Sequence, residues 1–291
     1  MTLGWPVVAA VLVAALLHAG WNALIKSGTD HELDTALIHV LGCGFGLALL
    51  ALVGLPPLAV WPYAAASLTI HVAYYIALVG AYRHGDLGFA YPIMRGSAPL
   101  LVALASAPVL GETLSPAAWI GVLAVSGGVL LIGLGRSDAE AGAKATAAQR
   151  RALGFALANA VIIAVYTVVD GAGVRVSGNA WQYVGLLFAV DGLPFMALVL
   201  WKRRARWAAT RAYVKARTPV ALVGSAASMG AYGIALWAMT QAPVASVAAL
   251  RETSVLFAAA IGVVFLKERF RLQRAIGTGA VVAGVMALRL G

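Results

Sequence analysis

The chain has 291 residues, of which 62% are hydrophobic and 11% charged, and its mean hydropathy is +0.90. Water-soluble domains carry about a quarter charged residues, so this composition excludes them and predicts a polytopic membrane protein. The net charge of +10 does not indicate a nucleic-acid partner, because the basic residues gather in a few loops between apolar stretches. The single cysteine, Cys43, excludes an internal disulfide.

Apolar stretches follow one another along the chain, each close to the ~20 residues that cross the hydrocarbon core of a bilayer as a helix. We expect an all-α protein with ten transmembrane helices, at residues 5–26, 34–55, 62–82, 88–110, 116–135, 152–174, 180–201, 219–240, 243–266 and 272–290. The stretch that begins at Trp5 is too long for a signal peptide and lacks a basic segment ahead of it, so we interpret it as the first span.

A polar, basic segment at 136–151 divides these spans into two sets of five. We therefore expect a first repeat at 1–135, a basic cytoplasmic linker at 136–151 and a second repeat at 152–291. Because five is odd, the two repeats must cross the membrane in opposite directions. Inverted repeats of this kind place a binding site near the bilayer midplane, where the halves meet.

The two halves are also related in sequence. Residues 81–135 and 237–291 align without a gap at an offset of 156, which places Arg95 on Arg251 and Glu112 on Glu268. The pairing of Gly121 with Gly277 and of Gly128 with Gly284 extends into the last span of each half. The chain is therefore a duplication, and a duplication in so apolar a chain is typical of transporters.

The orientation follows from the loop charges. Lysine and arginine residues are concentrated in the linker, in the loop after the seventh span and in the loop after the ninth, which all lie on one face. Basic loops stay in the cytoplasm. We therefore predict a multi-pass protein of the cell inner membrane with both termini in the periplasm.

Each half ends in a leucine-containing run, a glutamate and a glycine-rich closing span. These runs are Val109-Leu110-Gly111-Glu112-Thr113-Leu114 and Phe265-Leu266-Lys267-Glu268-Arg269-Phe270. Together with the two five-span halves, they resemble the EamA domains of the drug/metabolite transporter superfamily. The segment 18–26 is similar to the first span of bacterial members. The resemblance implies export of amino acids or other metabolites, and size and aromatic content suggest similarity to the aromatic amino-acid exporter group.

Several polar and aromatic side chains lie within the expected spans and share helical faces. In the first span these are Trp21 and Asn22, and in the third they are His71, Tyr74 and Tyr75; the second and sixth spans add His39 and Tyr166. Aromatic faces with a few hydrogen-bonding tips suit a small amphipathic solute, so we expect these residues to line a cavity. The alternative is that they make hydrogen bonds between helices.

Two arginines lie deep in equivalent spans. Arg95 and Arg251 are about eight residues, roughly 12 Å, from the nearest span end, so each needs an anion. We assign Arg95 to a substrate carboxylate, with Arg251 as a weaker candidate. The alternative is that both pair with protein carboxylates or with carbonyl groups at a broken helix. Tyr91 and Pro92 favour a kink just before Arg95.

Three carboxylates receive different interpretations. Asp191, in the seventh span and followed by Gly192, is a candidate to bind an ammonium group or carry a proton, or to neutralise an arginine. Glu112 and Glu268 lie just beyond spans, where a carboxylate accepts hydrogen bonds from backbone amides at a helix start. We therefore expect these two glutamates to be structural.

We predict an exporter of small metabolites, most of all amino acids, that works by alternating access. The alternatives are an exporter of other amphipathic metabolites or drugs, or an intramembrane enzyme. The sequence has no Walker A, Gly-x-Ser-x-Gly, His-Glu-x-x-His or cysteine-rich metal pattern, so we expect no enzyme and no cofactor. The expected partners are the substrate and the lipid bilayer, with protons as a candidate coupling ion and no nucleic acid.

Overall fold

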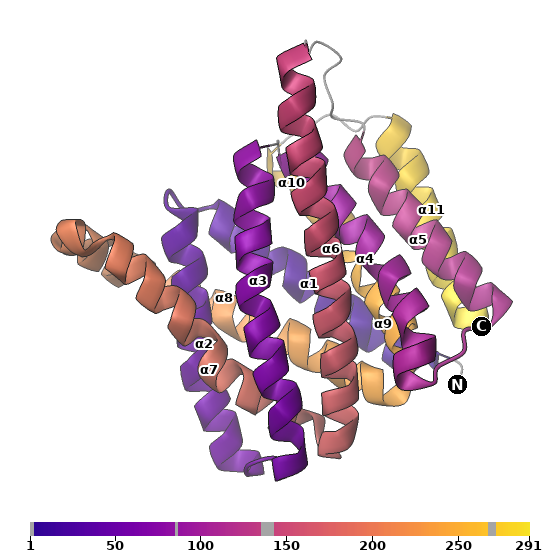
Figure 1. Cartoon of the computed structure of the whole chain (residues 1–291), viewed down its shortest axis with the longest axis horizontal. Helices are drawn as coiled ribbons and strands as arrows, with labels where there is room; N and C mark the ends of the chain where they lie inside the picture. Colours follow the sequence, from indigo (N-terminus) through magenta and orange to yellow (C-terminus); the bar gives the residue numbers. More distant parts are fainter. Residues whose placement is uncertain (1–2, 85–86, 135–142, 267–271) are drawn as a thin grey trace.

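A computed structural model describes residues 3–84, 87–134, 143–266 and 272–291, and its regular structure within those ranges is helical (Figure 1). The helices in chain order are α1 (Trp5–Lys26), α2 (His31–Val53), η1 (Leu58–Val60), α3 (Trp61–His84), α4 (Leu87–Leu110), α5 (Pro116–Leu134), α6 (Ala143–Ser177), α7 (Ala180–Lys202), η2 (Arg204–Arg206), α8 (Trp207–Gln241), α9 (Val244–Arg251), α10 (Ser254–Leu266) and α11 (Leu272–Leu290). Each stretch expected to span the membrane coincides with one of these helices or with a pair of them.

Two helices begin earlier than hydropathy indicates. α6 starts at Ala143, inside the segment expected to be a linker, and α8 starts at Trp207, inside the segment expected to be a basic loop. Both extensions are rich in alanine with lysine or arginine, which are strong helix formers although they are not apolar. Hydropathy therefore locates the part of a helix that suits lipid, while helix propensity carries the helix beyond it.

The ninth expected span is divided. α9 ends at Arg251 and α10 begins at Ser254, with Glu252 and Thr253 in a turn between them. α4, in contrast, is one continuous helix although Pro92, Pro99 and Pro108 lie within it. A kink is expected near Pro92; the helix interruption itself lies in the second half, at Glu252 and Thr253, four residues beyond the position equivalent to Pro92.

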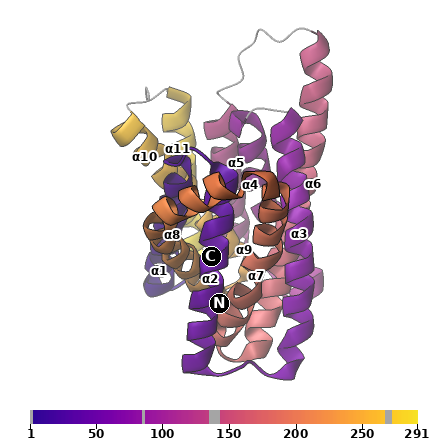
Figure 2. The same ribbon diagram turned by 90° about the vertical axis from the view of Figure 1, so that its left-hand side faces the viewer.

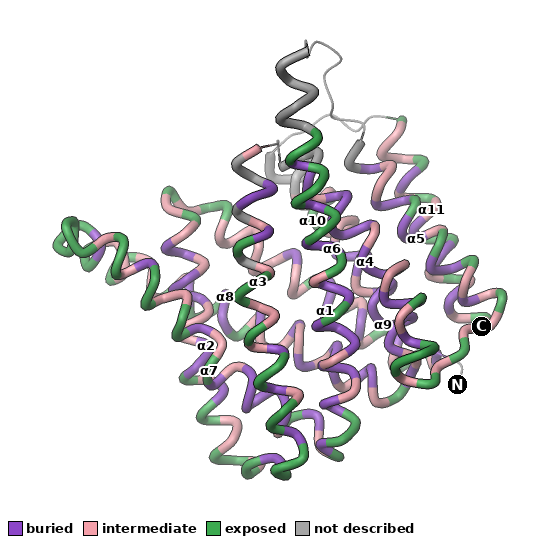
Figure 3. The backbone as a smooth tube through the Cα atoms, viewed as in Figure 1, coloured by how far each residue is buried: buried purple, intermediate pink, exposed green. Residues whose placement is uncertain are grey.

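Seven helical segments of the described residues are long and apolar enough to cross a membrane. They are Trp5–Lys26, His31–Val53, Ala90–Leu110, Arg150–Ser177, Ala180–Lys202, Arg204–Gln241 and Val244–Ile261. α5 contributes a shorter apolar segment, Pro116–Ile132. Large apolar side chains such as Leu52, Leu58 and Ile76 are exposed on the outside of the bundle, where green segments follow the outer helices in Figure 3. This surface suits lipid rather than water.

The helices pack in pairs that join the two halves of the chain. α2 packs along α7 and α5 along α11, at opposite edges of the bundle (Figure 1), while α1 packs with α8 and α3 with α6. Figure 2 shows α3 and α6 side by side from a second direction. α9 is the innermost helix, because every residue from Val244 to Leu250 is buried.

Glycines allow the closest of these contacts. A Cβ atom added at Gly128 of α5 would lie 2.7 Å from the carbonyl oxygen of Gly277, and one added at Gly121 would lie 2.9 Å from that of Gly284. Small residues let backbones approach closely where lipid supplies no hydrophobic force between helices. The same side of α5 is therefore pressed against α11 over two helical turns.

The neighbouring glycines Gly127 and Gly128 give a matched test of this contact. Gly128→Ala should destabilise the protein by about 1–3 kcal/mol through overpacking, whereas Gly127→Ala should be neutral or stabilising because open space surrounds its Cβ position. The measurement is the midpoint of thermal unfolding in detergent, followed by size-exclusion chromatography. Equal midpoints for the two variants would contradict the close α5–α11 contact.

Candidate functional site

A buried ion pair connects the two halves beside the break between α9 and α10. The Nε atom of Arg95, on α4, lies 2.9 Å from Oε2 of Glu252, and both side chains are almost fully buried. This is the pairing with a protein carboxylate that the sequence left open as the alternative for Arg95. The sequence had assigned Arg95 to a substrate carboxylate, yet in this structure its anionic partner is Glu252.

Arg251, the equivalent arginine of the second half, has a different environment. Its guanidinium lies over the ring of Tyr232, 5.2 Å from the centroid, and the ion pairs found among the described residues do not include it. A cation over an aromatic face keeps much of its capacity to bind an anion. The two arginines therefore differ: Arg95 is in an ion pair with Glu252, whereas Arg251 contacts an aromatic ring and lies within electrostatic range of the same carboxylate.

Asp170 on α6 holds Tyr232 in place. The hydroxyl of Tyr232 donates a hydrogen bond to one oxygen of this buried carboxylate, and the hydroxyl of Tyr183 donates to the other at 2.8 Å. Sequence reasoning did not assign a role to either tyrosine. Their positions inside apolar spans were the available signal, because a buried hydroxyl requires a partner.

Asp191 on α7 lies between two histidines from the first half. Its Oδ2 atom is 3.2 Å from Nδ1 of His39 on α2, and its Oδ1 atom is 3.7 Å from Nδ1 of His71 on α3. The adjacent Gly192 explains the approach, because a Cβ atom there would collide with the backbone of His39. The backbones of α2 and α7 are thus close enough to bring the carboxylate to the imidazole.

Aromatic rings extend this cluster in both directions. The Trp21 ring meets His39 edge-on at 6.1 Å and His18 at 5.2 Å. On the other side, Tyr166 lies 4.7 Å from His71 and 6.2 Å from Tyr74. Side chains from α1, α2, α3, α6 and α7 therefore form one continuous polar and aromatic group. Tyr74 and Tyr166 also lie within electrostatic range of Arg95, so this group adjoins the ion pair.

The remaining residues expected at the site lie as follows. The Asn22 side chain donates to the carbonyl oxygen of His18 on its own helix, at 2.8 Å. Tyr91 packs at the edge of an apolar cluster that includes Ile93 and Met94. The side chain of Tyr75 lies outside the described part of the structure. A cavity of about 260 Å³ lies elsewhere, at the ends of α5, α9 and α11, and none of these side chains lines it.

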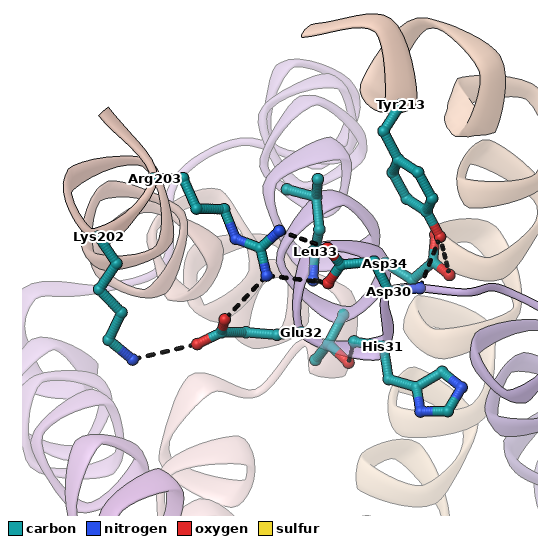
Figure 4. Close-up of polar contacts among 9 residues, drawn as sticks. Asp30, His31, Glu32, Leu33, Asp34, Lys202, Arg203 and Tyr213 are labelled. Carbon is teal, nitrogen blue, oxygen red and sulfur yellow. Dashed lines mark hydrogen bonds and ion pairs between the residues drawn. The ribbon is translucent and has the colours of Figure 1, made fainter. Parts of the chain in front are cut away.

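An ion-pair network ties the α1–α2 turn to the second half (Figure 4). Arg203 binds Asp30 and Glu32, Lys202 binds Glu32, and Arg217 binds Asp34 at 2.9 Å. Arg217 also donates to the carbonyl oxygen of Leu24, and Tyr213 donates to Asp34. Burial opposes ionisation of Asp30, but hydrogen bonds from Arg203 and the Leu33 amide lower its pKa below the usual value. The hydrogen bond to Asp30 raises the pKa of Arg203.

A second link closes the other end of the bundle. Glu112, in the turn between α4 and α5, accepts hydrogen bonds from the amide of Val244 and pairs with Arg175, whose Nε atom donates to the carbonyl oxygen of Met239. The expected structural role is confirmed for Glu112, with the difference that it caps α9 of the other half instead of α5. Glu268 lies outside the described residues.

Comparisons with known proteins bear on this architecture. Residues 150–290, the second half of the chain, match the model of the EamA-like transporter family. A solved crystal structure superposes on 98% of this chain and 96% of its own, with a TM-score of 0.68 and 21% sequence identity; at that identity the likeness extends to the fold alone. The search of curated proteins found no match. The EamA-like domain and the apolar helices together indicate a multi-pass membrane protein.

Arg217 and Arg211 test the network at the α1–α2 turn. Arg217→Gln should strongly lower the thermal unfolding midpoint, because it leaves the buried Asp34 without its counter-ion, a loss of about 3–5 kcal/mol for a buried pair. Arg211→Gln removes an exposed arginine of the same helix and should leave the midpoint unchanged. Similar midpoints in the two variants would show that the turn is not held by this contact.

Proposed function

We propose that the chain is a ten-span exporter of small metabolites, above all amino acids, in the cell inner membrane. The observation that carries the proposal is the meeting of charged and aromatic side chains from both halves inside the bundle, beside the break between α9 and α10. Charged groups within a bilayer are costly and mark solute paths. The EamA-like domain in the second half supports a transport function.

In this proposal the two halves are inverted repeats. The support is the reciprocal contact of α5 and α11, in which Gly121 approaches Gly284 and Gly128 approaches Gly277. In the sequence alignment of the two halves, Gly121 is equivalent to Gly277 and Gly128 to Gly284, so the two contacts are the same contact with the halves exchanged. A two-fold axis between two copies produces contacts exchanged in this way. The same axis also relates two other helix pairs. α1 packs with α8, and their equivalents in the opposite halves, α6 and α3, pack with each other.

The position of the two links supports the proposal of alternating access. The network of Arg203 and Arg217 joins the halves at one end of the bundle, and Glu112 joins them at the other. We infer that a solute enters when one link opens and leaves when the other does. Rocking of one repeat against the other around a central site is how inverted repeats transport solutes.

The proposed solute contacts are Arg251 for a carboxylate and the rings of Trp21, Tyr74 and Tyr166 for an apolar side chain. A guanidinium binds a carboxylate through two parallel hydrogen bonds, and ring faces accept an aromatic or aliphatic group. The same rings favour a second candidate function, the export of other amphipathic metabolites or drugs. Measured flux in proteoliposomes separates both from an intramembrane enzyme.

The carboxylate assignment is tested with an amino acid and its decarboxylated amine. Wild type should prefer the amino acid, and Arg251→Lys should lose most of that preference, because lysine keeps the charge but not the planar fork. A charge-assisted hydrogen bond of about 2 kcal/mol corresponds to roughly thirtyfold in apparent affinity. The measurement is counterflow of labelled solute in proteoliposomes.

Arg95→Lys is the matched variant, since Arg95 occupies the equivalent position but is paired with Glu252. It should lower thermal stability while the surviving protein keeps the wild-type preference. If Arg95→Lys lost the preference and Arg251→Lys kept it, the carboxylate would belong to Arg95, as the sequence first indicated.

The proposed topology places η2 in the cytoplasm and the α2–α3 turn in the periplasm. In a Cys43→Ser background, Ala205→Cys should resist a membrane-impermeant maleimide in intact spheroplasts of a bacterial host and react after lysis. Leu58→Cys, at a position that is also exposed but lies at the opposite end, should react in intact spheroplasts. The reverse labelling pattern would invert the proposed orientation.

A further inference from the structure

We propose that His39, Asp191 and His71 form a proton-binding site, and that export of the solute is coupled to entry of a proton there. The inference rests on the proposed transport function and adds the energy source for it. The cluster is formed by three helices, α2, α3 and α7, so that two imidazoles of the first half flank one carboxylate of the second.

The cluster lies deep within the bundle. His39 is eight residues from the start of α2, and His71 is ten residues from the start of α3, which corresponds to about 12 and 15 Å along the two helix axes. All three side chains are less than one-fifth exposed. Groups at this depth are shielded from both membrane surfaces, as a coupling site requires.

The two histidines differ in a way that leaves room for a proton. Nδ1 of His39 is within hydrogen-bond distance of Asp191, at 3.2 Å. Nδ1 of His71 is buried at 3.7 Å from the other oxygen and makes no hydrogen bond to the described residues. A proton taken up by His71 gives that nitrogen a charge-assisted contact with Asp191 after a shift of roughly 0.8–1.0 Å. The hydrogen bond between His71 and Asp191, which is absent in the present geometry, can therefore form when His71 is protonated.

The charge count also supports a proton. With both imidazoles neutral and the carboxylate ionised, the cluster carries one negative charge, and one added proton makes it neutral. A carrier changes from one access state to the other at a lower free-energy cost when its buried cluster is neutral than when the cluster is charged. A metal ion is a poorer fit, since no group of three or more potential ligands among the described side chains has metal-binding geometry.

Other titratable groups surround the cluster. Cys43 on α2 lies within electrostatic range of Asp191, and Asp170 on α6 lies within electrostatic range of His71. Tyr166 on α6 and Trp21 with His18 on α1 close the two sides through ring contacts. Asp170 already accepts hydrogen bonds from Tyr183 and Tyr232, so Asp191 is the carboxylate of this group that meets the two histidines.

The test compares two transport modes in the same proteoliposomes. A panel of radiolabelled amino acids identifies the solute with the fastest counterflow at equal pH. That solute is then offered outside at pH 7.5 to vesicles with a lumen at pH 6.5. Exchange of one proton per solute should concentrate the label in the acidic lumen up to about tenfold, since one pH unit is worth a factor of ten.

Asp191→Asn preserves the shape of the side chain and removes its charge. For each variant, the label accumulated in the pH gradient is divided by the label accumulated by counterflow at equal pH. In Asp191→Asn and in His71→Gln this ratio should fall to about one. His31→Gln, which removes a histidine at the start of α2 that is exposed, should keep the wild-type ratio. Arg251→Lys should slow counterflow but keep the ratio, because it alters the solute contact and not the proton site.

Three results would overturn the inference. Wild-type counterflow without accumulation in the gradient would leave an exporter that is not coupled to protons. A wild-type ratio in Asp191→Asn and His71→Gln would place the coupling elsewhere. Absence of counterflow for the whole panel, in protein that elutes as a single folded species, would overturn both the proton site and the transport of amino acids.

Discussion

A charge inside a membrane protein requires an opposite charge, and the Arg95–Glu252 pair is where this chain meets that requirement most fully. The pair joins α4 of one half to the turn between α9 and α10 of the other. Glu252 lies in that turn, and Arg251, the last residue of α9 before it, lies over the ring of Tyr232. Loss of either partner would leave a buried charge, at a cost of about 3–5 kcal/mol.

Much of the fold follows from hydropathy, since each expected span coincides with helix. The break after Arg251 did not follow, because the span has no proline after Pro243 at its start and is apolar on both sides of the break. This segment is distinguished by the ion pair of Glu252 with Arg95 on α4, which is distant in the sequence. The early starts of α6 and α8 were missed for a different reason, because alanine with lysine and arginine forms helix without being apolar.

The candidate site was predictable in its members but not in its pairings. Aromatic and histidine residues at helical spacing indicated Trp21, His71 and Tyr166, which the structure brings into one group. Which of Arg95 and Arg251 forms an ion pair within the described structure depends on how helices of the two halves are rotated against each other. Neighbouring residues in the sequence do not determine that rotation. The same holds for Glu112, whose carboxylate was recognised as a cap although its helix, α9, was not.

α8 is a single helix of 35 residues, and it reaches from the ion-pair network near its start to the interior of the bundle. Arg217 and Tyr232 lie fifteen residues apart on it, a separation of roughly 22 Å along the axis. Arg217 contacts the α1–α2 turn, while the ring of Tyr232 lies beneath Arg251. One continuous helix, with Pro219 inside it, therefore links the ion-pair network to the aromatic ring under Arg251.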